Sequence, residues 1–365
     1  MRRVNLYAII MIYWMVFMQL SALFTRAFLN GLLEITSITK FNNPLVYYLT
    51  SPFQQLEAII FGLFFGVLFI AIHELSEKIN LNTKNFGRII FFKSVMYLIG
   101  FALSAVLVYS IVGNFSIFPK ESIKELIHLK SFQSLFFIGL SILAGQTFLL
   151  NFIVQAIVKF GQNNLLNFLT GKYRAPIVED RVFLFIDLKS STTIAEQLGS
   201  IKYSRLIKSC FDEVNKLVDK YKADIYQYVG DEVVLTWRTD KVIKNHNHLK
   251  LYYALQEAFE KRSRYYQKKY GVVPEFKAGV HGGLVTVTEI GNIKRDIAYH
   301  GDVLNTASRI QGLCNEHNES LLTSGELLAR LESINGYQVR HIGEITLKGK
   351  TNAVAVSAVR KLERA

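Results

Sequence analysis

The sequence predicts two parts of different class, an N-terminal all-α bundle of transmembrane helices followed by an α+β domain. Two observations lead to this prediction. Long apolar runs are confined to residues 1–160, whereas residues 175–365 alternate short β-prone runs with amphipathic stretches, as a water-soluble α/β domain does. With 50% hydrophobic and 19% charged residues, the chain of 365 residues is also apolar-rich for a wholly soluble protein.

Four apolar runs are each long enough to cross a bilayer as a helix, which takes roughly 20 residues. They lie near 6–25, 56–74, 89–112 and 134–157. Arg2 and Arg3 precede the first run, but this run is too long and bulky for a cleavable signal peptide, and no small-residue cleavage site follows it. We therefore predict a four-helix transmembrane region over 1–158.

Basic residues are unevenly distributed over the short segments between these runs. The segments expected inside carry Arg2, Arg3, Lys78, Lys84, Arg88, Lys159, Lys172 and Arg174. The segments expected outside carry only Lys40, Lys120, Lys124 and Lys130. This asymmetry places the N-terminus and the soluble domain in the cytoplasm. We predict a multi-pass protein of the cell inner (plasma) membrane, with membrane lipid as a partner.

Several polar side chains lie within the predicted spans, where unpaired polar groups are costly. They are Lys93, Gln146, Asn151 and Gln155. We expect most of them to form hydrogen bonds between helices.

A linker over 159–180 joins the last span to the soluble domain, which we place at 181–361. Gly171 would end a short helix within the linker, and Pro176 makes residue 175 extended. We interpret this linker as the segment that couples the two parts.

The net charge of +13 indicates either nucleic acid or anionic lipid as a neighbour. Basic residues cluster at 261–264 and 268–269. Because no DNA- or RNA-binding module is visible, we expect no nucleic-acid partner and interpret the cluster as a solvated helix face near anionic headgroups.

The soluble domain alternates strands and helices. We expect strands at 181–187, 224–229, 232–237, 275–281 and 284–290, with a turn around Gly282-Gly283, and helices at 191–220 and 248–270. A helix near 303–315 and short strands near 320–323, 337–347 and 353–359 follow. The order βαββαβ, followed by extra elements, is typical of a ferredoxin-like fold.

Two aspartates each stand at the end of a short apolar run. Asp187 follows Phe-Leu-Phe-Ile, and Asp231 follows Tyr-Gln-Tyr-Val-Gly, where Gly230 permits a tight turn. Carboxylates presented in this way are hard oxygen ligands for Mg²⁺ or Mn²⁺, and a metal pair suits phosphoryl chemistry. A lone Gly-Asp could equally be a plain hairpin turn.

Two further segments carry polar groups suited to a nucleotide. Ser190, Ser191 and Thr192 precede a helix, so they could bind phosphate at its N-terminus or could simply cap it. Asn305 and Arg309 are four residues apart and share one helix face, where an amide and a guanidinium can hold ribose and phosphate.

In this order the three segments resemble the class III nucleotidyl cyclases, the adenylyl and guanylyl cyclase family, over about residues 180–360. Gly-Val-His-Gly-Gly at 279–283 and Leu-Lys-Gly-Lys at 347–350 belong to the resemblance. The implied fold is a ferredoxin-like cyclase domain. The implied partners are ATP or another nucleoside triphosphate, and a second copy of the chain in a homodimer with two sites at the interface.

The resemblance also implies roles for single residues. Asp187 and Asp231 would bind two Mg²⁺ or Mn²⁺ ions per active site, assisted by the backbone carbonyl of Leu188. Asn305 would orient the ribose and Arg309 would stabilise charge on the α-phosphate. Lys348 would contact the terminal phosphates.

The chain departs from the family pattern at the positions that read the base. Gln227 stands where cyclic-AMP-forming members usually carry lysine, and Ala298 where they carry aspartate or threonine. Guanine-reading members usually carry glutamate and cysteine there. A glutamine amide can still pair with a base edge, but alanine offers no side-chain hydrogen bond. The phosphate loop has Ser190-Ser191 in place of the more common Gly-Phe.

The leading hypothesis from the sequence is a membrane-bound adenylate cyclase that converts ATP to 3′,5′-cyclic AMP and pyrophosphate in intracellular signalling. One alternative is a non-catalytic, nucleotide-binding signalling module with a degenerate site, motivated by Gln227 and Ala298. A guanylate or a diguanylate cyclase is a further alternative. The helix with Asn305 and Arg309 argues against a diguanylate cyclase, as does Val229 in Val-Gly-Asp-Glu-Val.

Overall fold

The structure is a computed structural model that describes residues 2–35, 52–78, 86–114, 130–160, 167–168, 170–293, 295–332 and 334–362. The chain divides into two compact units, Met1–Leu166 and Asn167–Ala365. Each unit is described by itself below.

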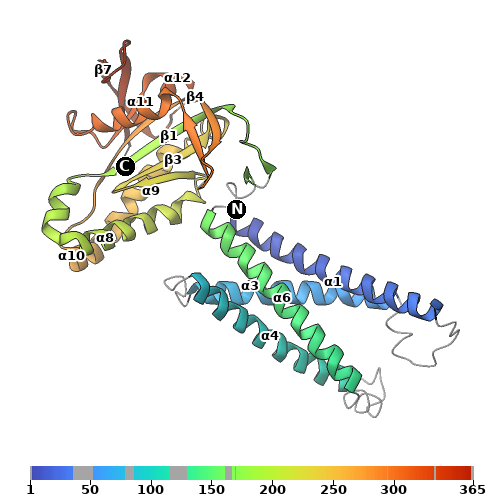
Figure 1. The fold of residues 1–365 in the computed structure, drawn as a ribbon. Coiled ribbons are helices and arrows are strands. Elements are labelled where there is room, and N and C mark those ends of the chain that lie inside the picture. Colours follow the sequence, from blue (N-terminus) through green and yellow to red (C-terminus); the bar gives the residue numbers. More distant parts are fainter. Residues whose placement is uncertain are drawn as a thin grey trace. The chain divides into compact units, whose positions relative to one another are not determined.

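Four long helices make up the described part of the N-terminal unit (Figure 1). They are α1 (Arg2–Ile35), α3 (Phe53–Lys78), α4 (Phe86–Asn114) and α6 (Lys130–Phe160). By length and apolar composition, three described segments could cross a membrane, namely Leu6–Ile35, Gln54–Ser76 and Phe137–Ile157. The span expected near 89–112 falls within α4 and stays a prediction.

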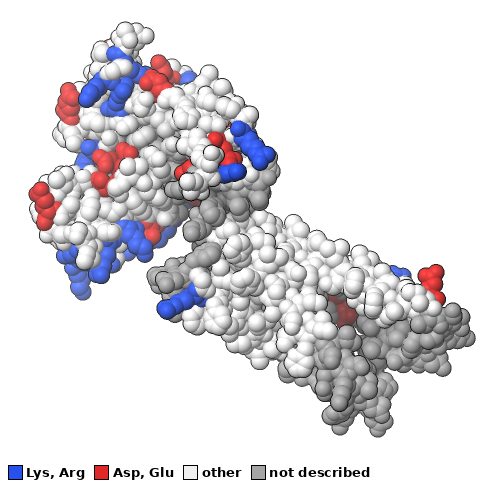
Figure 2. Space-filling view, in the orientation of Figure 1, with Lys and Arg blue, Asp and Glu red and all other residues white. Residues whose placement is uncertain are grey.

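The helices of this unit bury aromatic rings between them and expose apolar side chains outward. Trp14 is fully buried, with its ring centre 5.2 Å from that of Phe101, and Phe69 stacks on Tyr97 at 3.9 Å. On the outside, Phe24 is 71% exposed. The described surface of this N-terminal unit shows few charged residues in Figure 2. Such an apolar exterior is typical of helices that face lipid.

Polar side chains inside this unit bond between helices, which confirms that expectation for three of them. The Asn151 amide donates to the carbonyl oxygen of Ile90 at 3.0 Å, joining α6 to α4. The Tyr13 hydroxyl donates to the side chain of Gln146. Lys93 Nζ lies 3.5 Å from Nδ1 of His73.

The C-terminal unit is built on one mixed sheet. Its strands are β1 (Ile177–Leu188), β2 (Asp224–Val229), β3 (Glu232–Arg238), β4 (Phe276–Ile290), β5 (Asp296–His300), β6 (Leu321–Ser324), β7 (Tyr337–Ile345) and β8 (Val354–Lys361). The strand order is β2-β3-β1-β4-β6-β8-β7, and β5 pairs with β4. Only the β4–β6 pair is parallel among the pairs of the described sheet. The first strand begins at Ile177 rather than at 181, inside the predicted linker.

Helices cover both faces of this sheet. They are α8 (Ser191–Val218), α9 (Asn247–Lys261), α10 (Ser263–Tyr270), α11 (Asp302–Gly312) and α12 (Gly325–Arg330), with the 3₁₀ turn η2 (Thr239–Lys241) after β3. The single helix expected over 248–270 is interrupted at Arg262, whose φ and ψ are −105° and 14°. The guanidinium of Arg262 pairs at this point with the buried carboxylate of Glu213 on α8.

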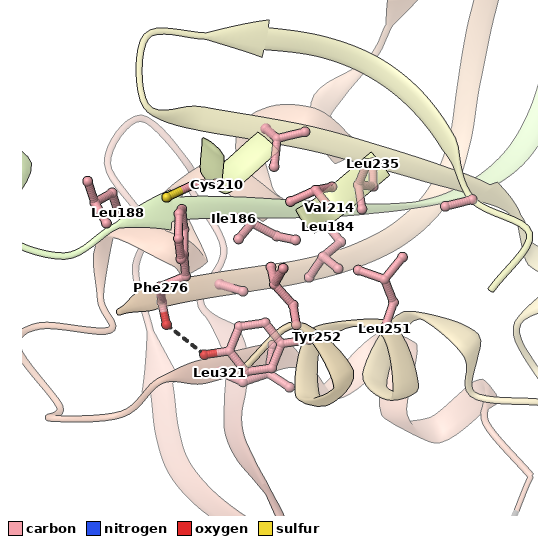
Figure 3. Packing of buried hydrophobic residues seen from close by; sticks show 14 of the residues in the cluster. Leu184, Ile186, Leu188, Cys210, Val214, Leu235, Leu251, Tyr252, Phe276 and Leu321 are labelled. Carbon is pink, nitrogen blue, oxygen red and sulfur yellow. Dashed lines mark hydrogen bonds between the residues drawn. The ribbon is translucent and has the colours of Figure 1, made fainter. Parts of the chain in front are cut away.

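Alternate residues of β1 point to opposite faces of the sheet. Leu184 and Ile186 pack with α8 and α9 in the largest buried cluster, where the Tyr252 hydroxyl donates to the carbonyl oxygen of Phe276 at 2.8 Å (Figure 3). A fully buried aliphatic side chain contributes about 1.5–3 kcal/mol, so this cluster fixes the position of β1.

The opposite face of β1 lies under α11. Phe183 and Phe185 pack there with Val303 and Ala307 of that helix. Because Asp187 continues the series of odd-numbered residues, its side chain is directed to the α11 face, at the end of the strand.

The expected turn at Gly282-Gly283 is wrong, because β4 runs without a break from Phe276 to Ile290. The glycines are needed for close packing instead. A Cβ atom at Gly279 would lie 2.2 Å from the backbone nitrogen of Gln311 on α11, and one at Gly282 would lie 2.9 Å from Val182. The absence of a side chain at Gly279 lets α11 rest directly on the sheet, and its absence at Gly282 gives room for Val182.

The buried His248 on α9 predicts a loss of stability in acid. Burial, with the nearby charge of His246, lowers the pKa of His248 to about 3, so the ring stays neutral in the fold. The unfolded chain would take up a proton below about pH 6.5, so stability is constant above that pH and falls below it. We expect the free energy of unfolding to be about 1.4 kcal/mol lower at pH 5.5 than at pH 7.5 from this residue.

Urea unfolding followed by the fluorescence of Trp237, whose ring lies 6.5 Å from His248, would measure this difference. His248→Leu should remove it. The exposed His300 provides the control, and His300→Leu should keep the full pH dependence. An unchanged pH dependence in His248→Leu would contradict the assignment.

Candidate active site

Asp187 and Asp231 form the centre of the candidate site. Asp187 lies at the end of β1, and Asp231 lies in the turn between β2 and β3, where Gly230 has φ of +59°. Because Ile186 pairs with Val233 in the antiparallel β1–β3 pair, Asp187 lies next to the turn that carries Asp231. Burial and the charge of Asp231 raise the pKa of Asp187. Among the described residues, buried Oδ2 of Asp231 has no hydrogen-bond partner.

Two further side chains contact Asp187, and the sequence did not predict either. Lys277 Nζ lies 3.4 Å from Oδ2 of Asp187, and Nε2 of Gln311 donates to the same oxygen at 3.0 Å. Lys277 is the direct partner of Asp187 in the antiparallel β1–β4 pair. The contact of Lys277 could therefore have been predicted only from the register between β1 and β4, which the sequence pattern did not assign.

Glu232 adds a third acidic group near the pair. Burial and the charges of Asp187 and Asp231 raise the pKa of Glu232 to about 7, against the opposing effect of Lys277. One lysine therefore does not neutralise the cluster. A buried, unpartnered carboxylate oxygen in such a cluster fits a divalent cation.

The described residues contain no group of three or more His, Cys, Asp or Glu side chains arranged as a complete metal site. Two aspartates suffice only if backbone and substrate oxygens complete the coordination, as is usual for Mg²⁺. Leu188, the residue assigned a carbonyl ligand, follows Asp187 directly and has its side chain buried on the opposite face.

In the segment after β1, the Ser191 side chain hydrogen-bonds Tyr203, whereas the Ser190 side chain does not cap α8, the helix that follows. The side chains of Ser190 and Thr192 are exposed, and Ser191 is half-buried. This observation weakens the capping interpretation and leaves the segment as a candidate phosphate loop.

Ser190 has φ of 55°, a left-handed conformation that glycine adopts without strain. This gives a physical reason for the glycine that is common at this position in the family. We expect Ser190→Gly to raise the free energy of unfolding by about 1 kcal/mol. Thermal unfolding would measure the gain. Ser191→Gly, at the first residue of α8, should give none, and an equal gain in both variants would contradict the explanation.

The helix α11 presents Asn305 and Arg309 beside the 347–350 tract. Nη2 of Arg309 lies 3.4 Å from the position of a Cβ atom at Gly349, and Lys350 Nζ pairs with Asp302 at 2.7 Å. The pair with Lys350 lowers the pKa of Asp302. Asn305 and Lys348 are exposed. These residues therefore form a second polar group on one side of α11.

The two positions that the resemblance predicts to read the base, Gln227 and Ala298, lie on β2 and β5. Gln227 is exposed, and a β-bulge between Ile225 and Gln227 sets Tyr226 and Gln227 together opposite Val234 of β3. Ala298 is buried and pairs with Thr288 of β4.

The predicted site residues thus fall into two groups. Asp187 and Asp231 lie together with the loop of Ser190, while Arg309 lies with the 347–350 tract. In the described part of the chain, no hydrogen bond or ion pair joins one group to the other. Gln311 of α11 donates to Asp187, so this helix adjoins both groups.

The mixed eight-stranded sheet with helices on both faces has the fold of a cyclase catalytic domain. The sequence model of the family described as adenylate and guanylate cyclase catalytic domain matches residues 176–358, half of the chain. The chain therefore belongs to this family, which confirms the resemblance drawn from the sequence.

Three curated proteins are similar to the chain. Adenylate cyclase 2 of Rhizobium meliloti (strain 1021) is 36% identical over 205 residues, which cover 56% of each chain. Adenylate cyclase 1 of the same organism is 26% identical over 53% of this chain and 29% of its own length. Adenylate cyclase of Anabaena cylindrica is 25% identical over 48% and 36%. The chain thus spans about half or less of the length of these relatives.

Among solved structures, the adenylyl cyclase CyaB from P. aeruginosa is similar to the chain. It has 20% sequence identity and a TM-score of 0.46, with coverage of 52% of this chain and 98% of that one.

Proposed function

We propose that this chain is a membrane-anchored adenylate cyclase, a lyase that converts ATP to 3′,5′-cyclic AMP and pyrophosphate. The observation that carries the proposal is the close pair Asp187 and Asp231, with a buried, unpartnered oxygen, in a domain of this family. The names of the curated relatives favour ATP as the substrate.

The reaction forms a bond between the ribose 3′-oxygen and the α-phosphorus, and breaks the bond from that phosphorus to the bridging oxygen of pyrophosphate. Two Mg²⁺ or Mn²⁺ ions, when bound, supply acidification of the 3′-hydroxyl and neutralisation of the phosphates. Asp187 and Asp231, with the Leu188 carbonyl, would hold these ions.

The remaining residues position the substrate and balance its charge. Asn305 would hold the ribose so that the 3′-oxygen lies in line with the bond that breaks. Arg309 would place its guanidinium beside the α-phosphate, where charge develops in the transition state. Lys348 would bind the terminal phosphates, and the hydroxyls of Ser190, Ser191 and Thr192 would donate to phosphate oxygens.

We further propose a homodimer, as the family resemblance implies, in which a two-fold axis would combine Asp187 and Asp231 of one protomer with Asn305 and Arg309 of the other into two complete sites. The arrangement β2-β3-β1-β4 with α8 and α9 supports a ferredoxin-like core within 181–361. The apolar helices support anchoring in the inner membrane over 1–158, with the linker at 159–180 and the catalytic domain in the cytoplasm.

The second candidate function is a non-catalytic module that binds a nucleotide. Gln227 and Ala298 favour it, because neither position carries the residue expected of a base reader. A guanylate cyclase is supported less, since these positions lack the glutamate and cysteine of guanine-reading members.

The test is turnover by the purified full chain with ATP and GTP in parallel, each with Mn²⁺ and with Mg²⁺. We expect cyclic AMP and pyrophosphate in equal amounts from ATP. Absence of product from both nucleotides with both metals would contradict the proposal, and nucleotide binding without turnover would then support the non-catalytic module.

A further inference from the structure

A buried arginine adjoins the two strands that carry the base-reading positions. Arg181 on β1 is only 5% exposed and lies on the α11 face of the sheet. Its Nε donates to Glu179 at 2.8 Å, and its guanidinium lies 4.9 Å from the ring centre of Tyr299 on β5. Its Nη1 lies 3.8 Å from a carboxylate oxygen of Asp224 on β2. One arginine therefore connects β1, β2 and β5.

The arginine is part of an aromatic cluster. The ring centre of Tyr299 is 5.3 Å from that of Phe183 and 4.9 Å from that of Tyr226, both in edge-to-face geometry. We call Arg181, Phe183, Tyr226 and Tyr299 the Arg181 cluster. Edge-to-face ring pairs and a cation over a ring each stabilise a cluster beyond the burial of its side chains, so these contacts hold the two tyrosine rings in place.

The cluster is joined directly to the base-reading positions along the chain. Tyr299 follows Ala298, and Tyr226 precedes Gln227 at the β-bulge. A shift of either ring therefore moves the neighbouring backbone. Since Ala298 has no polar side chain, discrimination between purines depends on the Gln227 amide and on the backbone groups of β5. Backbone groups discriminate only if they are held in place.

Glu179 fixes the orientation of the arginine. It also accepts hydrogen bonds from Lys172 at 2.9 Å and from the Tyr173 hydroxyl at 3.0 Å. Burial opposes its charge, but these donors and Arg181 outweigh burial and lower the pKa of Glu179 to about 2. The carboxylate is therefore charged at neutral pH, and the pair with Arg181 persists.

We propose that Arg181 is a positioning residue for purine selection, which holds Tyr299 and Tyr226 and thereby the base-reading positions 298 and 227. The inference rests on the proposed function and deepens it. Arg181 itself does not contact the substrate in this proposal. It determines how well the site distinguishes adenine from guanine.

The test compares Arg181→Lys with the wild type in the full chain. Lysine keeps the charge but loses the flat guanidinium that lies over Tyr299. We expect the KM for ATP to rise about tenfold, kcat to stay within about threefold, and the ratio of kcat/KM for ATP over GTP to fall at least about fivefold. Tyr299→Leu should give the same pattern, and the double variant should add little, because both act through one cluster.

Arg340→Lys is the control for an arginine that pairs with a glutamate elsewhere in the domain. Arg340 on β7 pairs with the buried carboxylate of Glu319, but it is itself exposed and lies outside the Arg181 cluster. Its kinetics and base preference should match the wild type. If thermal unfolding shows that Arg181→Lys is not folded, Glu179→Gln replaces it. Glutamine keeps the shape of the side chain and removes the charge that orients Arg181.

Equilibrium binding of fluorescent ATP and GTP analogues gives a readout without turnover. A wild type that binds ATP better than GTP but forms no product would contradict the proposed function, while the loss of that preference in Arg181→Lys would still support the inference. An unchanged KM and an unchanged base preference in Arg181→Lys would overturn it. So would a fall in kcat alone.

Discussion

Asp187→Asn is expected to lower the turnover of ATP by at least about 1,000-fold without unfolding the chain. Asparagine keeps the shape of the side chain and an oxygen that can accept from Gln311, but it removes the charge that would hold a divalent cation. Removing that charge also relieves its repulsion with Asp231 and Glu232. The variant should therefore be at least as stable as the wild type when no metal is bound.

Two measurements check this expectation. Cyclic AMP formation reports the loss of turnover, and thermal unfolding with and without Mn²⁺ reports the loss of metal binding. The wild type should be stabilised by Mn²⁺ through mass action, whereas Asp187→Asn should not. Asp240→Asn is the control, because Asp240 is exposed and forms an ion pair with Arg238 at 3.5 Å, away from the candidate site. Unchanged stabilisation by Mn²⁺ in Asp187→Asn would contradict the metal assignment.

The strand ends were the most predictable part of the site. Asp187 and Asp231 each follow a short apolar run, and the structure places both at strand ends, close to each other. A run of alternating burial determines where a strand ends and which face a residue takes, and both properties are local. The same reasoning placed Asn305 and Arg309 on one helix, within α11.

The errors have a different physical origin. Glycines at 282 and 283 were interpreted as a turn, although they provide room for Val182 and Val303 in a continuous strand. Composition cannot distinguish the two uses of glycine, since one depends on φ and the other on a distant contact. The contact of Lys277 with Asp187 was missed because it follows from the register between β1 and β4, two strands that are distant in the sequence.

The contacts within the Arg181 cluster could not be predicted from the sequence. The cluster brings together residues of β1, β2 and β5, and nothing in their spacing indicates contact. In the proposals made above, the choice of base, which the sequence left open, would depend on long-range packing. The chemistry would depend on residues at the ends of local elements.

Co-expression of Asp187→Asn with Arg309→Ala is expected to restore about a quarter of the wild-type activity, although each variant alone is inactive. In a two-fold dimer each site would combine Asp187 and Asp231 of one protomer with Asn305 and Arg309 of the other. About half of the dimers are mixed, and each mixed dimer holds one intact site and one site with both defects. Within one protomer, Arg309 lies 3.4 Å from the Cβ position of Gly349, and the family resemblance implies that it acts in the site of the partner protomer.

Two matched pairs make the result specific. Asp187→Asn with Asp231→Asn should not complement, because both changes affect the same half-site, and neither should Arg309→Ala with Asn305→Ala. Differently tagged protomers, co-purified before the assay, would establish that mixed dimers form in every pair. If Asp187→Asn and Arg309→Ala form mixed dimers but recover no activity, each chain completes its own site. The proposed arrangement of the sites across an interface would then be wrong.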